Sequence, residues 1–228
     1  LQGEDEYCLL PNFRLPQHIH SRSANAKWLA EIAHRNPLWV HPKDAAKLGV
    51  GEGDLLKVET EIGWFIDKVW VTEGIKPGII GCSHHIGRWR RKQDSGNRYM
   101  TNEVEIEDLG EGRMRMRTVS GVRPWESDDP DTNRVWWRDG GVHQNITHAV
   151  QPDPISGAHC WLQKVRISRP VEGERYGDVE VDTNKSFEYY KKWNEMAKER
   201  EVHPRGERRP LWMNRPLPPR KEHWFIRE

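Results

Sequence analysis

The sequence predicts a mainly β protein built on a small closed β-barrel, with short helices, an inserted hairpin and a long extended C-terminal tail. Short apolar runs separated by glycine and proline turns follow one another closely between residues 36 and 87. A single short helix interrupts them, which favours a small barrel over an open α/β sheet. Beyond residue 202, prolines, tryptophans and arginines accumulate without the regularly spaced apolar residues that a core needs.

The first elements lead into a polar segment. Tyr7 to Leu10 is the first expected strand, and residues 24–34 are expected to form a short helix. Between them lie an irregular stretch bracketed by Pro11 and Pro16 and a run rich in His, Arg and Ser at residues 17–23. Loops held by a rigid scaffold commonly carry binding sites, so this segment is a candidate site.

The barrel itself is expected from residues 36–87. Pro42 suits the first turn of a short helix, because its missing N–H group costs little there, and Gly49 is expected to end that helix in a left-handed conformation. The helix is expected over residues 43–48, and the strands over residues 38–40, 55–60 and 64–71, with a further strand that starts at residue 79.

The rest of the chain divides into an insertion, a closing strand and a tail. Residues 89–135 are interpreted as an insertion that contains a hairpin, because Arg and Met alternate from Arg113 to Arg117. The predicted domains are therefore a barrel domain at residues 1–169, with this insertion, and a tail at residues 170–228 that wraps other parts of the subunit or a partner. The expected hairpin strands are residues 103–108 and 113–119, the closing strand is residues 164–167, and the tail holds a strand at 178–181 and a helix at 187–200.

Composition excludes several classes of protein. The net charge of +1 gives no overall positive field that would attract nucleic acid. A local basic cluster is nevertheless formed by Arg88, Arg90, Arg91, Lys92 and Arg98. It is interpreted in one of two ways, as a surface that faces solvent or another subunit, or as an anion-binding site. Three widely spaced cysteines argue against a disulfide framework, a structural zinc site or an iron–sulfur motif. No apolar run of about 18 residues is present, so no direct membrane span is expected. No targeting segment is visible, which leaves the compartment open.

The stretch HPKDAAKLGVGEGDLLKVETEIGWFIDKVWVTEGIKPGII, residues 41–80, resembles the double-psi β-barrel of the molybdopterin oxidoreductases of the dimethyl sulfoxide reductase family. The resemblance covers about residues 7–87 and 136–169. It implies that the chain is the C-terminal, cofactor-binding part of a large subunit. The segments GVHQN and DPISGAHCW most resemble the thiosulfate or polysulfide reductase and formate dehydrogenase-like branch.

The resemblance also implies site residues. In the polar segment, Asn12 stands where the family usually has Thr, and arginines there can hold a pyrophosphate through charge-assisted hydrogen bonds. After the third barrel strand, His84 stands where an aromatic residue is usual. Because neighbouring residues of a strand point to opposite faces, only one of the two histidines there is expected to face the site. The implied cofactor-binding residues are Asn12, Arg14, His18, His20, Ser21, Arg22, His84, His85, Gly87, Asn145, His159, Trp161 and Gln163.

The implied cofactor is a pair of molybdopterin guanine dinucleotides that hold molybdenum or tungsten. An iron–sulfur cluster is expected elsewhere in the full-length protein. The implied partners are an iron–sulfur electron-transfer subunit, as in anaerobic respiration, and the remainder of the catalytic subunit. No catalytic residue and no metal ligand is expected in this chain, so it should bind and orient the cofactor and be inactive alone.

Three other interpretations stay open at this point. A stand-alone double-psi barrel that binds protein partners would need neither the histidine-rich loop nor a closing strand at Asn145-Ile146-Thr147. Nucleic-acid binding would use the basic cluster with Trp89. Cys82 and His84, two residues apart, would be the first members of a metal site. Trp136 and Trp137 are interpreted as packing residues.

Overall fold

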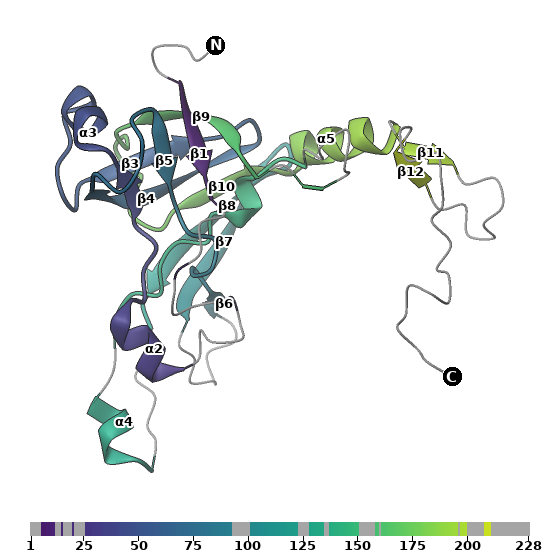
Figure 1. Ribbon diagram of the computed structural model, residues 1–228. Coiled ribbons are helices and arrows are strands. Elements are labelled where there is room, and N and C mark those ends of the chain that lie inside the picture. The colour runs from purple at the N-terminus through teal and green to yellow at the C-terminus, as the bar shows by residue number, and fades with distance from the viewer. Residues whose placement is uncertain are drawn as a thin grey trace, which may run out of the picture. The chain divides into compact units, whose positions relative to one another are not determined.

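Six strands close into a barrel in the computed structural model of the chain (Figure 1). The structure describes residues 6–11, 15, 20, 26–92, 101–122, 128–134, 137–150, 158–159, 161–195, 197–199 and 208–210. These residues fall into two compact units, one formed by Leu1–Ala149 and Trp161–Phe187, the other by Val150–Cys160 and Glu188–Glu228. All strands of the sheet that contains the barrel belong to the first unit.

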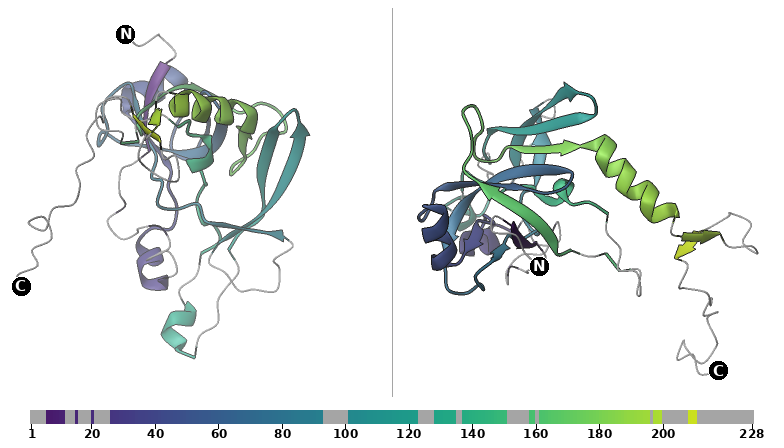
Figure 2. Two further views of the ribbon diagram at one scale, coloured as in Figure 1. Left: turned by 90° about the vertical axis from the view of Figure 1, so that its right-hand side faces the viewer. Right: turned by 90° about the horizontal axis from the view of Figure 1, so that it is seen from above.

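The barrel strands follow the order β2-β5-β1-β9-β3-β4, and a pairing between β2 and β4 closes the ring. Two of the pairs, β1 with β5 and β2 with β4, are parallel, whereas the other pairs in the ring are antiparallel. The ribbons in Figures 1 and 2 curve around a common interior. The barrel strands are β1 (Glu6–Leu10), β2 (Leu38–Val40), β3 (Leu55–Glu59), β4 (Gly63–Val71), β5 (Ile79–Gly81) and β9 (Gln163–Ser168).

Alternation of side chains along these strands fills the barrel. Strand β9 alternates buried and exposed residues along its whole length, as a strand with one face on a core does. Its inward residues pack with apolar side chains of the other strands, and many of those are fully shielded from solvent. The core includes Leu9, Leu38, Val40, Leu56, Val58, Phe65, Val69, Ile80, Val165 and Ile167.

The short helix α3 (Pro42–Leu48) forms as the sequence predicts. Pro42 occupies its first turn, His41 Nδ1 accepts a hydrogen bond from the Lys43 N–H group at 3.1 Å, and Gly49 ends it with φ 66°. Asp44 of this helix accepts a hydrogen bond from the Gly78 N–H group at 2.7 Å. That bond ties the helix to the turn before β5.

The sheet continues beyond the barrel because β4 is long enough to serve several partners. On β4, Phe65 pairs with Val179 of β10 (Val179–Asp182), and β10 in turn pairs with β8 (Arg113–Ser120). Gly63 permits this approach, since a Cβ atom there would lie 2.1 Å from the Glu180 carbonyl oxygen. Strand β7 (Asn102–Gly110) pairs with β8, and strand β6 (Trp89–Arg91) pairs with β7 as the last strand of the sheet.

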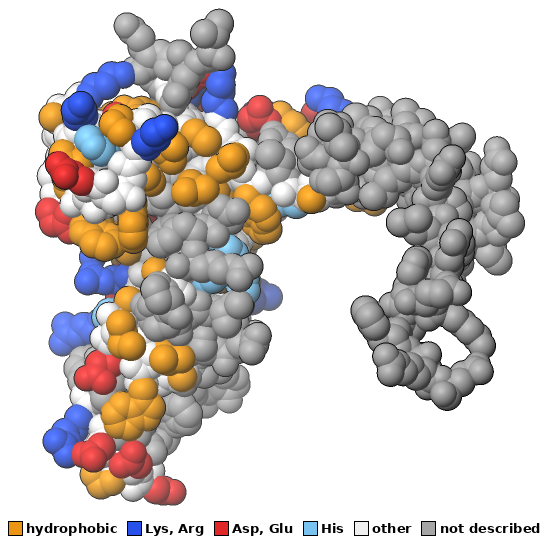
Figure 3. All heavy atoms as spheres, in the orientation of Figure 1, with side chains coloured by type: hydrophobic (Ala, Val, Ile, Leu, Met, Phe, Trp, Pro, Cys, Tyr) orange, Lys and Arg blue, Asp and Glu red, His pale blue; other side chains and the backbone are white. Residues whose placement is uncertain are grey.

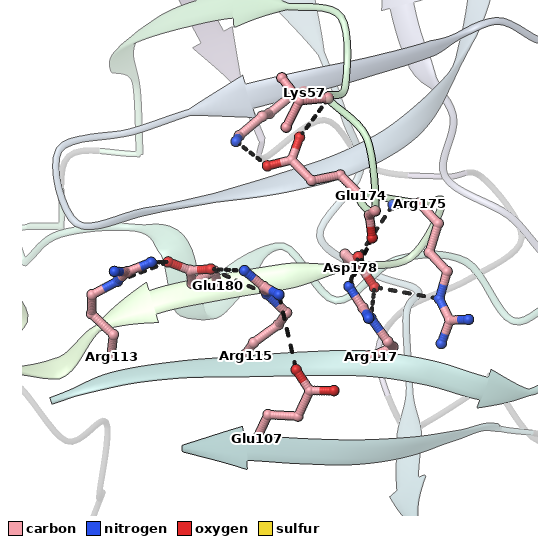
Figure 4. Close-up of polar contacts among 11 residues, drawn as sticks. Lys57, Glu107, Arg113, Arg115, Arg117, Glu174, Arg175, Asp178 and Glu180 are labelled. Carbon is pink, nitrogen blue, oxygen red and sulfur yellow. Dashed lines mark hydrogen bonds and ion pairs between the residues drawn. The ribbon is translucent and has the colours of Figure 1, made fainter. Parts of the chain in front are cut away.

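The predicted hairpin is confirmed as β7 and β8, which project as a long ribbon in Figure 2. The alternating arginines of β8 form ion pairs with acidic residues, as Figure 4 shows. The buried Glu180 accepts hydrogen bonds from Arg113, at 2.6 Å to Nη2, and from Arg115, at 2.9 Å to Nη2. Arg117 binds Asp178 at 2.8 Å. The basic face of the predicted hairpin is therefore a structural face joined to β10.

The remaining helices are short. The segment expected as a helix over residues 24–34 contains α2 (Lys27–Ile32), and Ala30 of this helix packs with Val122 and Trp137 in a second small core. That contact confirms the packing role expected of Trp137, whereas Trp136 lies outside the described residues. Other helices are α4 (Pro130–Arg134), the 3-10 helix η2 (Asn145–Thr147) and α5 (Thr183–Glu195).

Two expectations about chain conformation are wrong. Asn145-Ile146-Thr147 is not a strand but the 3-10 helix η2, in which the Thr147 hydroxyl donates to the Gln144 carbonyl at 2.8 Å. The strand before His84 ends at Gly81, and His84 and His85 lie in a turn. Gly81, Ser83 and Asn145 are residue types that favour turns, so both stretches carried a local signal against a continuing strand.

The predicted tail begins with ordered structure. The expected strand at 178–181 corresponds to β10, and the expected helix at 187–200 corresponds to α5 up to Glu195. The end of that expected helix is wrong, because residues 197–199 form a strand. In the second unit, β11 (Ala197–Glu199) pairs with β12 (Arg208–Pro210), a pairing that the sequence pattern did not indicate. The boundary after residue 169 and the wrapping role of residues 170–228 stay predictions. In the described part of the chain, no helix combines the length and apolar character that a membrane span requires.

Candidate cofactor-binding site

Three imidazole rings meet at the end of β5. The ring centroids of His84 and His85 lie 4.5 Å apart, and that of His20 lies 4.9 Å from His84 and 4.8 Å from His85. His85 is buried and His20 is exposed, so the group runs from the interior to the surface. Figure 3 shows histidine side chains, in pale blue, at several separate places on the face that it draws.

The expectation that only one of the two adjacent histidines faces the site stays a prediction, but its premise is wrong. It assumed a continuing strand, in which neighbours point to opposite faces. Because the chain turns after Gly81, the rings of His84 and His85 lie next to each other. The His84 Nδ1 atom lies 2.8 Å from the Pro11 carbonyl oxygen, which fixes the orientation of that ring.

A buried asparagine joins this turn to a loop more than fifty residues further along the chain. Asn36 is 1% exposed, and its amide donates to the Ser83 carbonyl at 2.7 Å and to the Val142 carbonyl at 2.9 Å. Its Oδ1 atom accepts from the Val142 N–H group at 2.8 Å. Asn36 thus holds the histidine turn and the loop before η2 together, a role that no motif in the sequence announced.

A glycine allows the two loops to touch. Gly87 has φ 90°, and a Cβ atom there would lie 2.2 Å from the Val142 carbonyl oxygen. Its N–H group donates to the Gly140 carbonyl at 3.0 Å. Asn102 donates to the Gly141 carbonyl and accepts from the Gly140 N–H group, which fixes the other side of the same loop.

Two amide side chains from the second loop lie against the histidine turn. Gln144 is fully buried and donates to the Cys82 carbonyl at 2.9 Å, and Asn145 donates to the His84 carbonyl at 3.4 Å. Among the described residues, the buried oxygens Gln144 Oε1 and Asn145 Oδ1 have no hydrogen-bond donor. Buried acceptors normally have a donor, so these oxygens suit a ligand with N–H groups.

An aromatic surface borders the same turn. The Trp161 ring stacks on His84 with a centroid distance of 5.3 Å and an interplanar angle of 26°. The His148 ring lies at right angles to Trp161 at 6.4 Å. Stacked aromatic rings beside amide groups offer both a flat surface and hydrogen bonds to a planar heterocycle.

The structure thus brings together His20, His84, His85, Gly87, Asn145 and Trp161 of the predicted site residues. Gln163 is buried, and its amide lies 3.3 Å from the Ala149 carbonyl, where it supports the segment after η2. His159 belongs to the second unit, in which burial lowers its pKa. The predicted residues Asn12, Arg14, His18, Ser21 and Arg22 lie outside the described residues.

The basic cluster at residues 88–92 is tied to the hairpin. The buried guanidinium of Arg90 pairs with Glu103 at 2.8 Å, and Lys92 pairs with the partly exposed Glu105 at 2.7 Å. Arg98 lies outside the described residues. In the described residues these contacts favour a structural role for the cluster over an anion site.

Burial dominates the electrostatics beneath the site. It raises the pKa of the Asp67 carboxyl well above the ordinary range and, with Asp67 nearby, also raises that of the Cys82 thiol. Cys82 is fully buried, and its Sγ atom lies 3.3 Å from the Asn36 carbonyl oxygen. The alternative in which Cys82 and His84 begin a metal site therefore has no support from the described geometry. Burial also lowers the pKa of His143, because it disfavours the charged imidazolium.

The closed barrel carries two polar loops that are joined by hydrogen bonds beside the end of β5. Comparison with known families gives the class directly: residues 9–158 match the Molydopterin dinucleotide binding domain. The match covers well over half of the chain, so the chain belongs to this family. The predicted resemblance and the predicted molybdopterin dinucleotide cofactor are therefore confirmed.

Several relatives match over part of the chain. A protein of Halobacterium salinarum, named as the catalytic component of a dimethyl sulfoxide reductase, is 35% identical over 91 residues, 38% of this chain and 10% of its own length. The arsenate respiratory reductase molybdopterin-containing subunit of Chrysiogenes arsenatis is 27% identical over 115 residues, 47% of this chain and 12% of its own.

A trimethylamine-N-oxide reductase of Haemophilus influenzae is 30% identical over 79 residues, 35% of this chain and 9% of its own. The matched region thus spans about a tenth of the length of these curated relatives. Among solved structures, acetylene hydratase from Pelobacter acetylenicus aligns with 23% identity and a TM-score of 0.32 over 35% of this chain and 11% of its own.

Proposed function

We propose that this chain binds and orients a molybdopterin guanine dinucleotide as the C-terminal part of the catalytic subunit of a molybdenum or tungsten oxidoreductase. The observation that carries the proposal is the buried pair of acceptor oxygens on Gln144 and Asn145, next to three imidazoles. A pterin ring carries amino and ring N–H groups that match such acceptors. The bound cofactor supplies the metal and the two-electron chemistry.

The residues of this chain hold and position that cofactor. Asn145 Oδ1 accepts from an N–H group of the ligand, while its own amide keeps it against the histidine turn. His84 and His85 offer ring nitrogens to polar edges, and Trp161 supports His84 by stacking. Asn36 keeps the two loops at a fixed separation, so the site is formed before the ligand arrives.

The segment of residues 12–22 completes the proposed site. Asn12, Arg14, His18, Ser21 and Arg22 are assigned there from the sequence. Arginines suit the pyrophosphate of a dinucleotide because a planar guanidinium can donate two parallel hydrogen bonds. His159 and Gln163 complete the assignment, Gln163 as a support for the loop after η2.

The relatives' names include reductases of dimethyl sulfoxide, arsenate and trimethylamine N-oxide. On the sequence segments GVHQN and DPISGAHCW alone, we assign the chain to the sulfur-compound reductase or formate dehydrogenase type. The partners are an iron–sulfur electron-transfer subunit plus the remainder of the catalytic subunit, and residues 170–228 form the tail that contacts them. The alternative of a stand-alone barrel that binds proteins is disfavoured by the buried polar groups at the loop end.

Equilibrium binding of the purified 228-residue chain to molybdopterin guanine dinucleotide tests the proposal. Bound pterin is measured by dialysis and by its fluorescence after acid oxidation. We expect saturable binding, which Asn145→Ala and His85→Ala each weaken about 10-fold, equivalent to about 1.4 kcal/mol. Asn133→Ala, on the exposed surface of α4, is the matched control. Absence of binding, or equal affinity in the site variants and the control, would refute the proposal.

A further inference from the structure

The histidine group has a second chemical capacity. We propose that His20, His84 and His85 form a binding site for a divalent transition metal ion of the zinc class in the cofactor-free chain. One ligand atom from each of the three residues lies within 4.8 Å of the others. Zinc binds histidine nitrogens at about 2.0–2.1 Å, so neighbouring ligand atoms around it lie roughly 3.3 Å apart. Side-chain rotations that shorten these separations by up to about 1.5 Å would bring the three imidazoles to that geometry.

The ring orientations suit coordination. The planes of His20, His84 and His85 are inclined to one another by 56°, 64° and 65°, so none of the three pairs is stacked. Rings that are not stacked are free to turn a nitrogen-bearing edge toward a shared ion, as in sites where three histidines leave a fourth position for water. A set of three imidazoles is typical of zinc, nickel, cobalt and copper, not of calcium or magnesium.

An outer contact fixes one of the ligands in a metal-binding tautomer. The Pro11 carbonyl oxygen is an acceptor only, so the His84 Nδ1 atom, 2.8 Å away, must donate the hydrogen bond. The neutral ring then carries its lone pair on Nε2, the atom that binds a metal. A backbone carbonyl that orients a histidine in this way is the usual outer partner of a metal ligand.

The burial of the three ligands provides an entry path. His85 is 2% exposed and forms the inner end of the group, whereas His20 is exposed and lies at the outer end. A hydrated ion can therefore approach from the side of His20. No carboxylate belongs to the group among the described residues, so the site relies on neutral imidazoles and weakens as they are protonated.

The same imidazoles belong to the cofactor site proposed above, and the two ligands are expected to exclude each other. The metal site does not rest on that function, because it is measured on the chain without cofactor. Failure of zinc binding would leave the pterin-binding result untouched, and failure of pterin binding would leave the zinc result untouched.

Isothermal titration of the untagged 228-residue chain with zinc chloride at about pH 7.5 tests the site. We expect the parent chain to bind one zinc ion at about pH 7.5 and to bind it more weakly at about pH 5.5. At about pH 7.5, each of the variants His20→Asn, His84→Asn and His85→Asn should bind zinc at least about 10-fold more weakly than the parent chain. His34→Asn is the matched control, because His34 stacks on Trp137 in the same unit and is not a member of the group. Circular dichroism establishes that each variant is folded, and the exposed His20 variant tests the site even if His85→Asn unfolds.

Two results would overturn the inference. One is absence of zinc binding at millimolar concentration. The other is a His20→Asn chain that binds zinc as tightly as the parent chain, which would remove the third ligand from the site.

Discussion

Replacing Asn36 with alanine should loosen the two loops that form the site without unfolding the barrel. The side chain makes three hydrogen bonds to the backbone of Ser83 and Val142 at 2.7–2.9 Å, and it is 1% exposed. Each such bond contributes about 1 kcal/mol net, and buried backbone groups left without partners add to the loss. The expected decrease in the free energy of unfolding is about 3–5 kcal/mol, within the stability of about 5–15 kcal/mol that is usual for a domain.

Urea denaturation followed by tryptophan fluorescence measures this loss, with Asn133→Ala as the exposed control. Asn36→Asp adds a contrast: its carboxylate would face two carbonyl oxygens, so at neutral pH it should be at least as destabilising as alanine. In the folded fraction, affinity for the pterin dinucleotide should fall as the loops separate. A loss of less than about 1 kcal/mol for Asn36→Ala would refute the bracing role.

The remaining predictions concern other parts of the same unit. Gly87→Ala should lower the free energy of unfolding by about 2–4 kcal/mol, since its φ is 90° and a backbone carbonyl oxygen would lie 2.2 Å from the new Cβ atom. Gly53→Ala, with φ 81° but open space around the new Cβ atom, should lower it by about 1 kcal/mol. Equal losses for the two variants on thermal denaturation would contradict this. Burial acts to raise the pKa of Glu180, but hydrogen bonds from its two arginine partners outweigh it and lower the pKa. The carboxylate of Glu180 therefore contributes fully to stability above the ordinary glutamate pKa, and this contribution is lost as pH falls through the lower pKa of the folded state. Glu180→Gln should lower the free energy of unfolding by about 1–3 kcal/mol at about pH 7 and by less at about pH 3. A difference between the two chains that does not change with pH would count against this prediction. Cys82 is fully buried and its thiol has a raised pKa, so in the native chain it should react with iodoacetamide far more slowly than the partly exposed Cys8. Mass spectrometry measures the two rates of alkylation, and comparable rates would contradict this prediction.

Much of the barrel followed from local sequence. Proline at the start of α3, glycine at its end and the turns around Gly63 and Gly78 marked the boundaries of the strands to within a residue or two. These signals are local, because they depend on the backbone conformations that proline and glycine permit. The hairpin β7–β8 followed from alternation for the same reason.

The site could be predicted only in part. The histidines were identified from a resemblance, but their mutual contact depends on the turn after Gly81 and on His20, which is far away in sequence. Asn36 was missed because an isolated asparagine has no spacing signal, and its importance arises from carbonyl groups 47 and 106 residues further along the chain. Long-range hydrogen bonds of this kind leave no periodic trace in the sequence.

The ring of strands has a consequence for synthesis. Strands β1 and β3 each need β9 as a neighbour, yet β9 lies after the long excursion of residues 82–162. As the chain leaves the ribosome, both strands must wait with unpaired edges until residue 168 has emerged. Exposed edges of this kind invite intermolecular pairing, so expression of a version truncated before β9 should yield aggregates, and a chaperone that shields nascent strands should raise the yield of the intact chain.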